Sequence, residues 1–113
     1  MHPTTSVEVP VDIYESPMEV VIVMPLGGVE KSSIRLSLDQ TTLHIRGERL
    51  PPHLKETLLP QQEGCFWWPF HKNITLPEQV YFEKIHSELS PTNILTIIVP
   101  KVIIPETIPV HIL

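Results

Sequence analysis

Proline recurs throughout this chain, and its spacing restricts the fold more than any other feature. The sequence holds 13 prolines among 113 residues. A proline inside a helix removes a backbone donor and clashes with the preceding turn, so long helices are disfavoured. Between the prolines lie short runs rich in β-branched and apolar residues, which favour strands. The spacing therefore predicts a β fold, and the length suffices for one domain with one core.

Alternation of apolar and polar side chains locates the strands. In the run 34–38, Ile34, Leu36 and Leu38 alternate with polar residues, and the run 43–46 repeats the pattern after a short turn. Two such runs joined by a short turn are typical of an antiparallel hairpin. The predicted strands cover residues 11–15, 19–24, 34–38, 43–46, 70–76 and 94–99. Short strands at this spacing indicate an all-β fold, an immunoglobulin-like antiparallel β-sandwich.

The segments between the predicted strands carry turn and breaker signals. Pro25 is expected to end the strand 19–24, because proline cannot donate to a central ladder. Asn93 is expected to take a left-handed backbone in the turn before the last strand. Residues 78–85 predict a turn of helix or an irregular link, and residues 1–10, polar and proline-containing, predict a mobile arm.

A long excursion interrupts the strand rhythm between residues 50 and 64. Pro51 and Pro52 open it, and Thr57-Leu58-Leu59 inside it predicts a short strand. A loop of this length in a small domain is usually functional or disordered.

Charge and cysteine usage narrow the function classes. The formal net charge is −5, which repels phosphate backbones and disfavours nucleic acid as a partner. The longest apolar run, 20–26, is too short to span a membrane, and the N-terminus lacks a signal-peptide layout. Cys65 is the single cysteine, so no internal disulfide is expected. These features predict a cytoplasmic protein, with Cys65 a packed or half-exposed thiol rather than a nucleophile.

No pattern for catalysis, a cofactor or a metal stands out. The chain lacks a nucleophile elbow, a phosphate-binding glycine loop and a His-Glu-x-x-His helix. The histidines have no cysteine or second histidine at ligand spacing, so structural or solvated roles are favoured over a metal site. They are His2, His44, His53, His71, His86 and His111. We therefore expect no catalytic residue, no cofactor and no metal, and an enzyme is disfavoured.

The ordered strand segments resemble the alpha-crystallin domain of small heat-shock proteins over residues 11–101. The resemblance implies a short N-terminal arm at 1–10 and a C-terminal tail at 102–113. Four positions depart from the family's usual residues: Gly27 stands where proline is usual, Trp68 and Asn93 stand where glycine is usual, and Lys72 stands where arginine is usual. The resemblance is carried by residues 11–15, Leu26-Gly27-Gly28-Val29, 34–36, 43–49, 70–77, 93–101 and the motif Ile108-Pro109-Val110.

The resemblance implies an ATP-independent chaperone, a holdase. Such a protein covers exposed apolar surface and strand edges of unfolding proteins, which otherwise aggregate. The implied partners are a second copy, in a homodimer or a larger homo-oligomer, and unfolded client proteins. Two alternatives remain: a co-chaperone-type β-sandwich adaptor that binds one folded partner, and a structural assembly subunit without clients.

The resemblance also implies that the long loop takes part in strand exchange. Its short strand would cross to the partner and pair with the partner's first strand. The alternative is a loop without a fixed partner. The residues expected to exchange are Val11, Ile13 and Glu15 on one copy and Thr57, Leu58 and Leu59 on the other.

The tail motif Ile108-Pro109-Val110 is expected to dock into an apolar groove on another copy. Burying Ile108 and Val110 would contribute roughly 1.5–3 kcal/mol each. Ordering the tail would cost roughly 1–2 kcal/mol per residue, so a single link is weak. The alternative is a disordered tail. The expected groove residues are Ile34, Leu36 and Leu38 on one strand and Leu95, Ile97 and Val99 on the other.

An aromatic cluster follows the long loop. It consists of Phe66, Trp67, Trp68 and Phe70, of which alternation lets only part face the core. This cluster is a candidate client-binding patch. The alternative is that neighbouring loop and core residues cover it.

Overall fold

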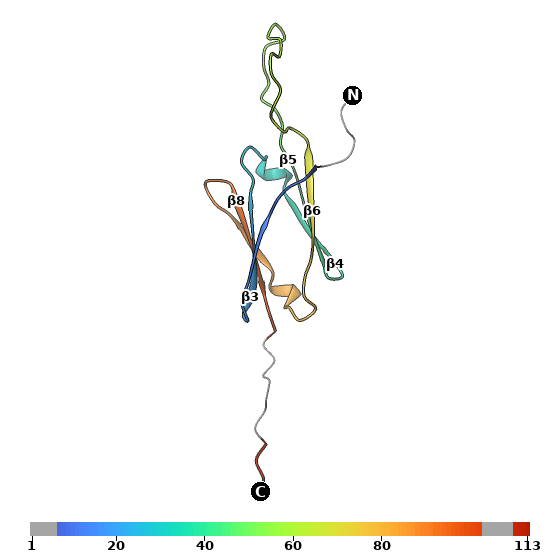
Figure 1. Ribbon diagram of the computed structural model, residues 1–113, viewed down its shortest axis with the longest axis vertical. Coiled ribbons are helices and arrows are strands. Elements are labelled where there is room, and N and C mark those ends of the chain that lie inside the picture. The colour runs from blue at the N-terminus through green and yellow to red at the C-terminus, as the bar shows by residue number, and fades with distance from the viewer. Residues whose placement is uncertain (1–6, 103–109) are drawn as a thin grey trace.

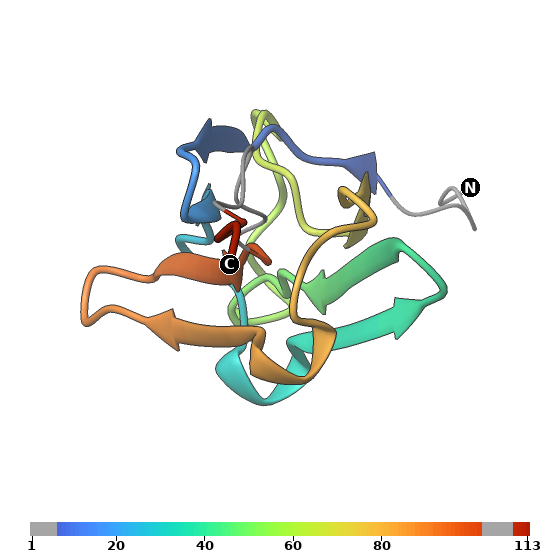
Figure 2. The same cartoon turned by 90° about the horizontal axis from the view of Figure 1, so that it is seen from below.

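Two packed β-sheets form the body of the molecule (Figure 1). The computed structural model describes residues 7–102 and 110–113, with the side chains of the first range described from Val9 onward. In these residues one sheet has the order β1-β6-β5-β4 and the other the order β2-β3-β8-β7. Apart from a parallel β1–β6 pair, all neighbours are antiparallel. The predicted all-β sandwich is confirmed, and Figure 2 shows it from one end.

The strand bounds follow the predicted pattern closely. The first and last residues of the predicted strands differ from the observed ones by one or two positions, because strand pairing rather than residue propensity sets where a strand ends. The strands are β1 (Val7–Glu8), β2 (Asp12–Glu15), β3 (Glu19–Pro25), β4 (Arg35–Asp39), β5 (Thr42–Glu48), β6 (Pro69–Thr75), β7 (His86–Leu89) and β8 (Ile94–Pro100), with 3-10 turns η1 (Lys31–Ser33) and η2 (Phe82–Lys84).

The core fills the space between the two sheets with alternate residues of the central strands. On β3 the buried positions are Val20, Ile22 and Met24, with more exposed residues between them. Strand β5 in the facing sheet and strand β8 next to β3 show the same alternation of buried and more exposed residues. The other core side chains are Leu26, Val29, Leu43, Ile45, Phe70, Ile74, Leu76, Val80, Leu95, Ile97 and Val99.

Two turns place a residue with a side chain in the left-handed region. Gln40 has φ 55° in the β4–β5 turn, and Asn93 has φ 62° before β8. Asparagine tolerates this conformation better than most residues, and the prediction for Asn93 is confirmed. Its carbonyl accepts a hydrogen bond from the Leu26 amide at 2.7 Å, so the turn ties the β7–β8 hairpin to the end of β3.

Two local expectations were wrong. Strand β3 does not end before Pro25: that residue still pairs in register with Ile94, at the end of the ladder and beyond the reach of β2. Part of the predicted mobile arm forms β1, which pairs with Phe70 and His71. A two-residue strand bound through its backbone to a sheet edge needs no side-chain pattern, so the sequence did not show it.

Candidate assembly surfaces

The long loop projects from one end of the sandwich (Figure 1). Residues 57–59 form no strand there, and the Leu58 amide instead donates to the Lys55 carbonyl at 3.0 Å in a turn. The short strand predicted at 57–59 is thus absent from the single chain, since a strand needs a partner edge. The loop exposes a series of large apolar side chains: Leu50, Leu54, Leu58, Leu59 and Phe66, with Leu59 76% exposed.

A sheet edge is open at β2. All four of its residues are exposed, and within the described residues it pairs only with β3. Ile13 lies opposite Ile22 and therefore shares the face that Ile22 buries completely, yet Ile13 is 52% exposed. The facing sheet therefore does not cover the core side of this edge. An apolar side chain left open on an unpaired edge marks a place for an additional strand.

The remaining residues predicted for strand exchange lie at the same edge. Val11 precedes β2 and packs partly against the core. Glu15 forms an ion pair with Lys101, at 2.7 Å between carboxylate and ammonium. The structure therefore gathers Val11, Ile13 and Glu15 at one edge, and it does not pair this edge with residues 57–59.

An apolar cleft of about 200 Å³ lies between β4 and the segment of η2 and β7. It is lined by Leu36, Ser37, Leu38 and Leu43 on one side and by Phe82, Ile85, His86 and Ser87 on the other. Both walls belong to edge strands, β4 in one sheet and β7 in the other. An extended segment in this cleft would meet apolar side chains and unpaired backbone groups together.

Of the six residues predicted for the tail-receiving groove, two line this cleft and the others do not. Leu36 and Leu38 line the cleft, and Ile34 packs partly against the core. Leu95, Ile97 and Val99 are instead core residues of β8, at most 3% exposed. Strand β7 lies between β8 and the cleft, and the sequence analysis missed it because its residues are mostly exposed and do not alternate.

One signal would have found part of the missing wall. Phe82 and Ile85 are three residues apart, and in a 3-10 turn such residues lie on the same side. The helical turn considered for residues 78–85 therefore already placed both side chains together. The structure forms that turn at η2, and both side chains pack partly against the core.

The tail motif is described only at its end. Ile108 and Pro109 lie outside the described residues, whereas Val110 and Ile112 are 84% and 96% exposed. Tail docking therefore stays a prediction.

The aromatic cluster divides between loop and core. Phe70 is 4% exposed and belongs to the core, so its assignment to an exposed patch was wrong. Phe66 and Trp67 are 52% and 37% exposed. Trp68 meets Phe66 edge to face at 5.4 Å between ring centroids. The exposed aromatic surface is thus continuous along the chain with the apolar side chains of the loop.

Within 7–102 and 110–113, no three His, Cys, Asp or Glu side chains gather as metal ligands. In the same residues no helix has the length and apolar character needed to cross a membrane. Cys65 is exposed on the long loop.

Comparisons with known proteins agree with this architecture. The model of the Hsp20/alpha crystallin family matches residues 12–112. No curated protein matches the sequence. Among solved structures, heat shock protein 16.0 from Schizosaccharomyces pombe is similar with a TM-score of 0.77 and 21% identity, covering 95% of this chain and 99% of that one.

Two bacterial structures are nearer in sequence. A small heat-shock protein from Xylella fastidiosa has a TM-score of 0.73 and 27% identity over 92% of this chain and 93% of its own. The protein hspA from Xanthomonas axonopodis has a TM-score of 0.71 and 28% identity over 86% of this chain and 96% of its own. With the family match over nearly the whole sequence and the sandwich described above, this chain belongs to the Hsp20/alpha crystallin family of small heat-shock proteins.

Proposed function

We propose that this protein is an ATP-independent holdase that binds unfolding proteins and prevents their aggregation. The observation that carries the proposal is the projecting loop with its exposed leucines and aromatic side chains, next to a sandwich whose own core is complete. Exposed apolar surface of this extent usually serves an interaction. The proposed mechanism needs only reversible coverage of apolar surface, without a catalytic group or cofactor.

The exposed thiol of Cys65 suits a reducing compartment, and we place the protein in the cytoplasm.

The proposed working unit begins with a dimer. The loop of one copy would lay residues 57–59 along the β2 edge of its partner, and the same contact would recur in reverse. Two observations support this arrangement: β2 is an unpaired edge with an uncovered Ile13, and the loop carries apolar residues without a site in its own chain. Strand addition would cover both features at once.

Links between dimers would use the tail. We propose that the segment containing Ile108 and Val110 docks into the cleft between β4 and β7 of another dimer. The leucine-lined wall and the two unpaired strand edges support this choice. Each link is weak by itself, but later links within one assembly are effectively intramolecular.

Suppression of client aggregation tests the holdase proposal directly. A reduced or heated model client is followed by light scattering with and without the protein, and ATP is added to a parallel sample. Suppression at near-stoichiometric ratio, unchanged by ATP, is expected. Unchanged scattering would refute the holdase and, together with one specific folded partner in a pull-down, would favour an adaptor.

A loop variant connects that activity to the structure. Leu54→Ser with Leu59→Ser removes two exposed side chains that make no core contact, and it should lower suppression severalfold without unfolding the sandwich. Gln61→Ser with Gln62→Ser is the matched control in the same loop. Equal suppression of aggregation by both variants would show that the activity does not depend on the apolar side chains of the loop.

A further inference from the structure

The outer face of the sheet β1-β6-β5-β4 places basic side chains in adjacent positions. Arg35 on β4 is the register partner of Arg46 on β5, and Arg46 is in turn the partner of His71 on β6. Like charges directly opposite each other destabilise a sheet. In a chain with a net charge of −5, such a row has no evident benefit for folding. A row of this kind indicates an anion as its partner.

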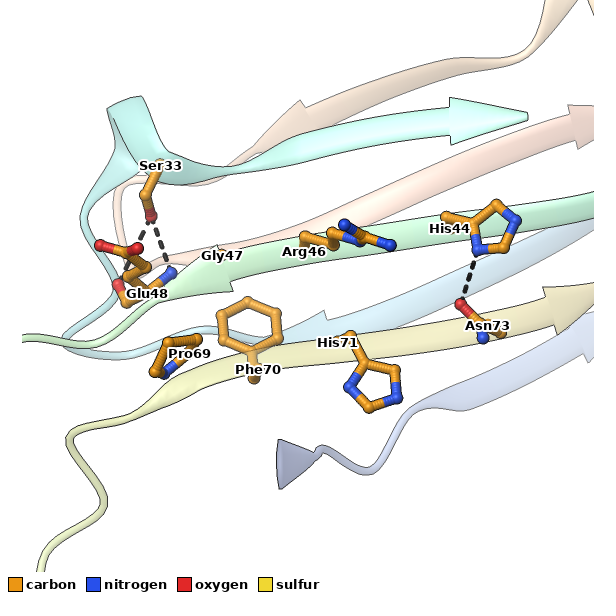
Figure 3. A pocket seen from close by; sticks show the side chains of 9 residues that line it. All are labelled: Ser33, His44, Arg46, Gly47, Glu48, Pro69, Phe70, His71 and Asn73. Carbon is orange, nitrogen blue, oxygen red and sulfur yellow. Dashed lines mark hydrogen bonds between the residues drawn. The ribbon is translucent and has the colours of Figure 1, made fainter. Parts of the chain in front are cut away.

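A pocket of about 520 Å³ lies over this row (Figure 3). In the next row His44 is the partner of Asn73, and His44 Nδ1 donates to Asn73 Oδ1 at 2.7 Å. This bond places the proton of the neutral imidazole on Nδ1 and directs that hydrogen at the Asn73 side chain. The amide Nδ2 of Asn73 adds two donors. The pocket is lined by Ser33, His44, Arg46, Gly47, Glu48, Pro69, Phe70, His71 and Asn73.

Arg46 is the cation available to a ligand. The Arg35 guanidinium donates to the carbonyls of Ser32 and Ile34, at 2.6 Å and 3.0 Å. Arg46, by contrast, is exposed, and no carboxylate of the described residues forms an ion pair with it. Figure 3 shows its guanidinium directed along β5 toward His44 and away from Glu48.

We propose that this pocket binds a small oxyanion of the phosphate class, with Arg46 as its main ligand and the side-chain amide of Asn73 as an additional donor. The planar guanidinium presents paired N–H donors that match two oxygens of a tetrahedral anion. The site is separate from the loop, the β2 edge and the cleft between β4 and β7, so it does not depend on the holdase proposal.

Charged groups on each neighbouring strand share this face or are in register with it. They are Arg35 and Asp39 on β4, Arg46 and Glu48 on β5, His71 on β6 and Glu8 on β1, the register partner of His71.

Titration of the full chain with sodium phosphate and sodium sulfate, followed by NMR at constant ionic strength, tests the proposal. Saturable shifts of β5 and β6 amides and of the Arg46 side chain are expected with both anions. Arg46→Gln should weaken binding about tenfold, the loss of a hydrogen-bonded charge. Glu48→Gln should tighten it, because the variant removes a negative charge from the pocket lining.

The control is Lys55→Gln, which removes the same charge from the long loop and should leave binding unchanged. Circular dichroism verifies that each variant retains the sheet signal. Shifts that rise without saturation, that acetate or chloride reproduces with equal affinity, or that Arg46→Gln and Lys55→Gln reduce equally would overturn the site. Glu48→Gln, which removes the negative charge from the pocket lining and leaves Arg46 in place, provides the test if Arg46→Gln does not fold.

Discussion

Gly47 lies in β5 opposite Phe70, and its missing side chain leaves room for the phenyl ring. A Cβ built on Gly47 would lie 2.7 Å from two ring carbons of Phe70 and 3.3 Å from a methyl group of Val29. Both neighbours are core residues, and the ring has little freedom to move away. The glycine is therefore required by packing, at a position where its backbone needs no unusual angle.

Gly47→Ala should lower the free energy of unfolding by about 1–3 kcal/mol, the cost of overpacking a core. Urea denaturation monitored by tryptophan emission measures the change. Gly27→Ala is the control, because a Cβ there would meet nothing within 4 Å, and it should change stability by about 0.5 kcal/mol or less. Equal losses for the two variants would contradict the packing argument.

Single residues show which inferences a sequence supports. The left-handed Asn93 was predictable, because its conformation depends on local turn chemistry. The sequence did not show that Phe70 is buried while its aromatic neighbours are more exposed. Which side of β6 faces the core is fixed by its pairing with β5. A turn conformation set by neighbouring residues can thus be predicted from the sequence. Which side of a strand faces the core depends on a partner strand elsewhere in the chain.

The elements repeat this division. Strand β5 was predicted from alternating apolar and polar residues, and strands β3 and β8 were predicted from runs of apolar and β-branched residues. Strands β1 and β7 were missed because they are held mainly by backbone pairing at sheet edges and carry no such pattern. Because β7 was missed, the second wall of the groove was assigned to β8. The position of the cleft therefore depends on a strand that the sequence pattern does not show.

Removal of the long loop should leave a monomer. A variant in which a short turn replaces residues 51–66 keeps all strands but loses the segment proposed to pair with β2 of the partner. Native mass spectrometry measures the mass, and replacement of residues 61–64 alone by glycine and serine is the control. An unchanged dimer after loop removal would refute strand exchange.

The cleft between β4 and β7 can be blocked at its rim. Leu38 is 39% exposed, so Leu38→Asp should cost little stability while it places a charge where an apolar tail would dock. Assemblies larger than the dimer should dissociate, as measured by light scattering of the purified protein. Ile94→Asp, at a residue 37% exposed on β8 outside the cleft, is the control and should retain them.

At the scale of the whole molecule, the sandwich is a complete unit that keeps its interaction surfaces outside its core. The core side chains come from both sheets, and none of the described polar or charged residues is buried. The loop and the β2 edge contribute little to that core, whereas the cleft shares Leu43 with it. Changes at the exposed residues of the loop and the β2 edge should therefore alter assembly and client binding with little effect on folding.

Ile108→Ala with Val110→Ala should reduce the assembly to dimers, because each truncation removes most of the roughly 1.5–3 kcal/mol expected from burying the side chain. The loop contact within each dimer should remain. Analytical ultracentrifugation distinguishes the species, and His111→Ala is the control in the same tail. Identical sedimentation of the wild type and the double variant would refute tail docking.

The loop leaves the sandwich at one end, whereas β8 ends at the other (Figure 1). Contacts made through the loop and through the segment after β8 would consequently point in opposite directions, as in the two reactive groups of a bifunctional monomer. Such a unit grows by linkage until a ring or shell closes. A copy that lacks either attachment would act as a chain terminator, and small amounts of it would limit the size of the assembly formed by all the others.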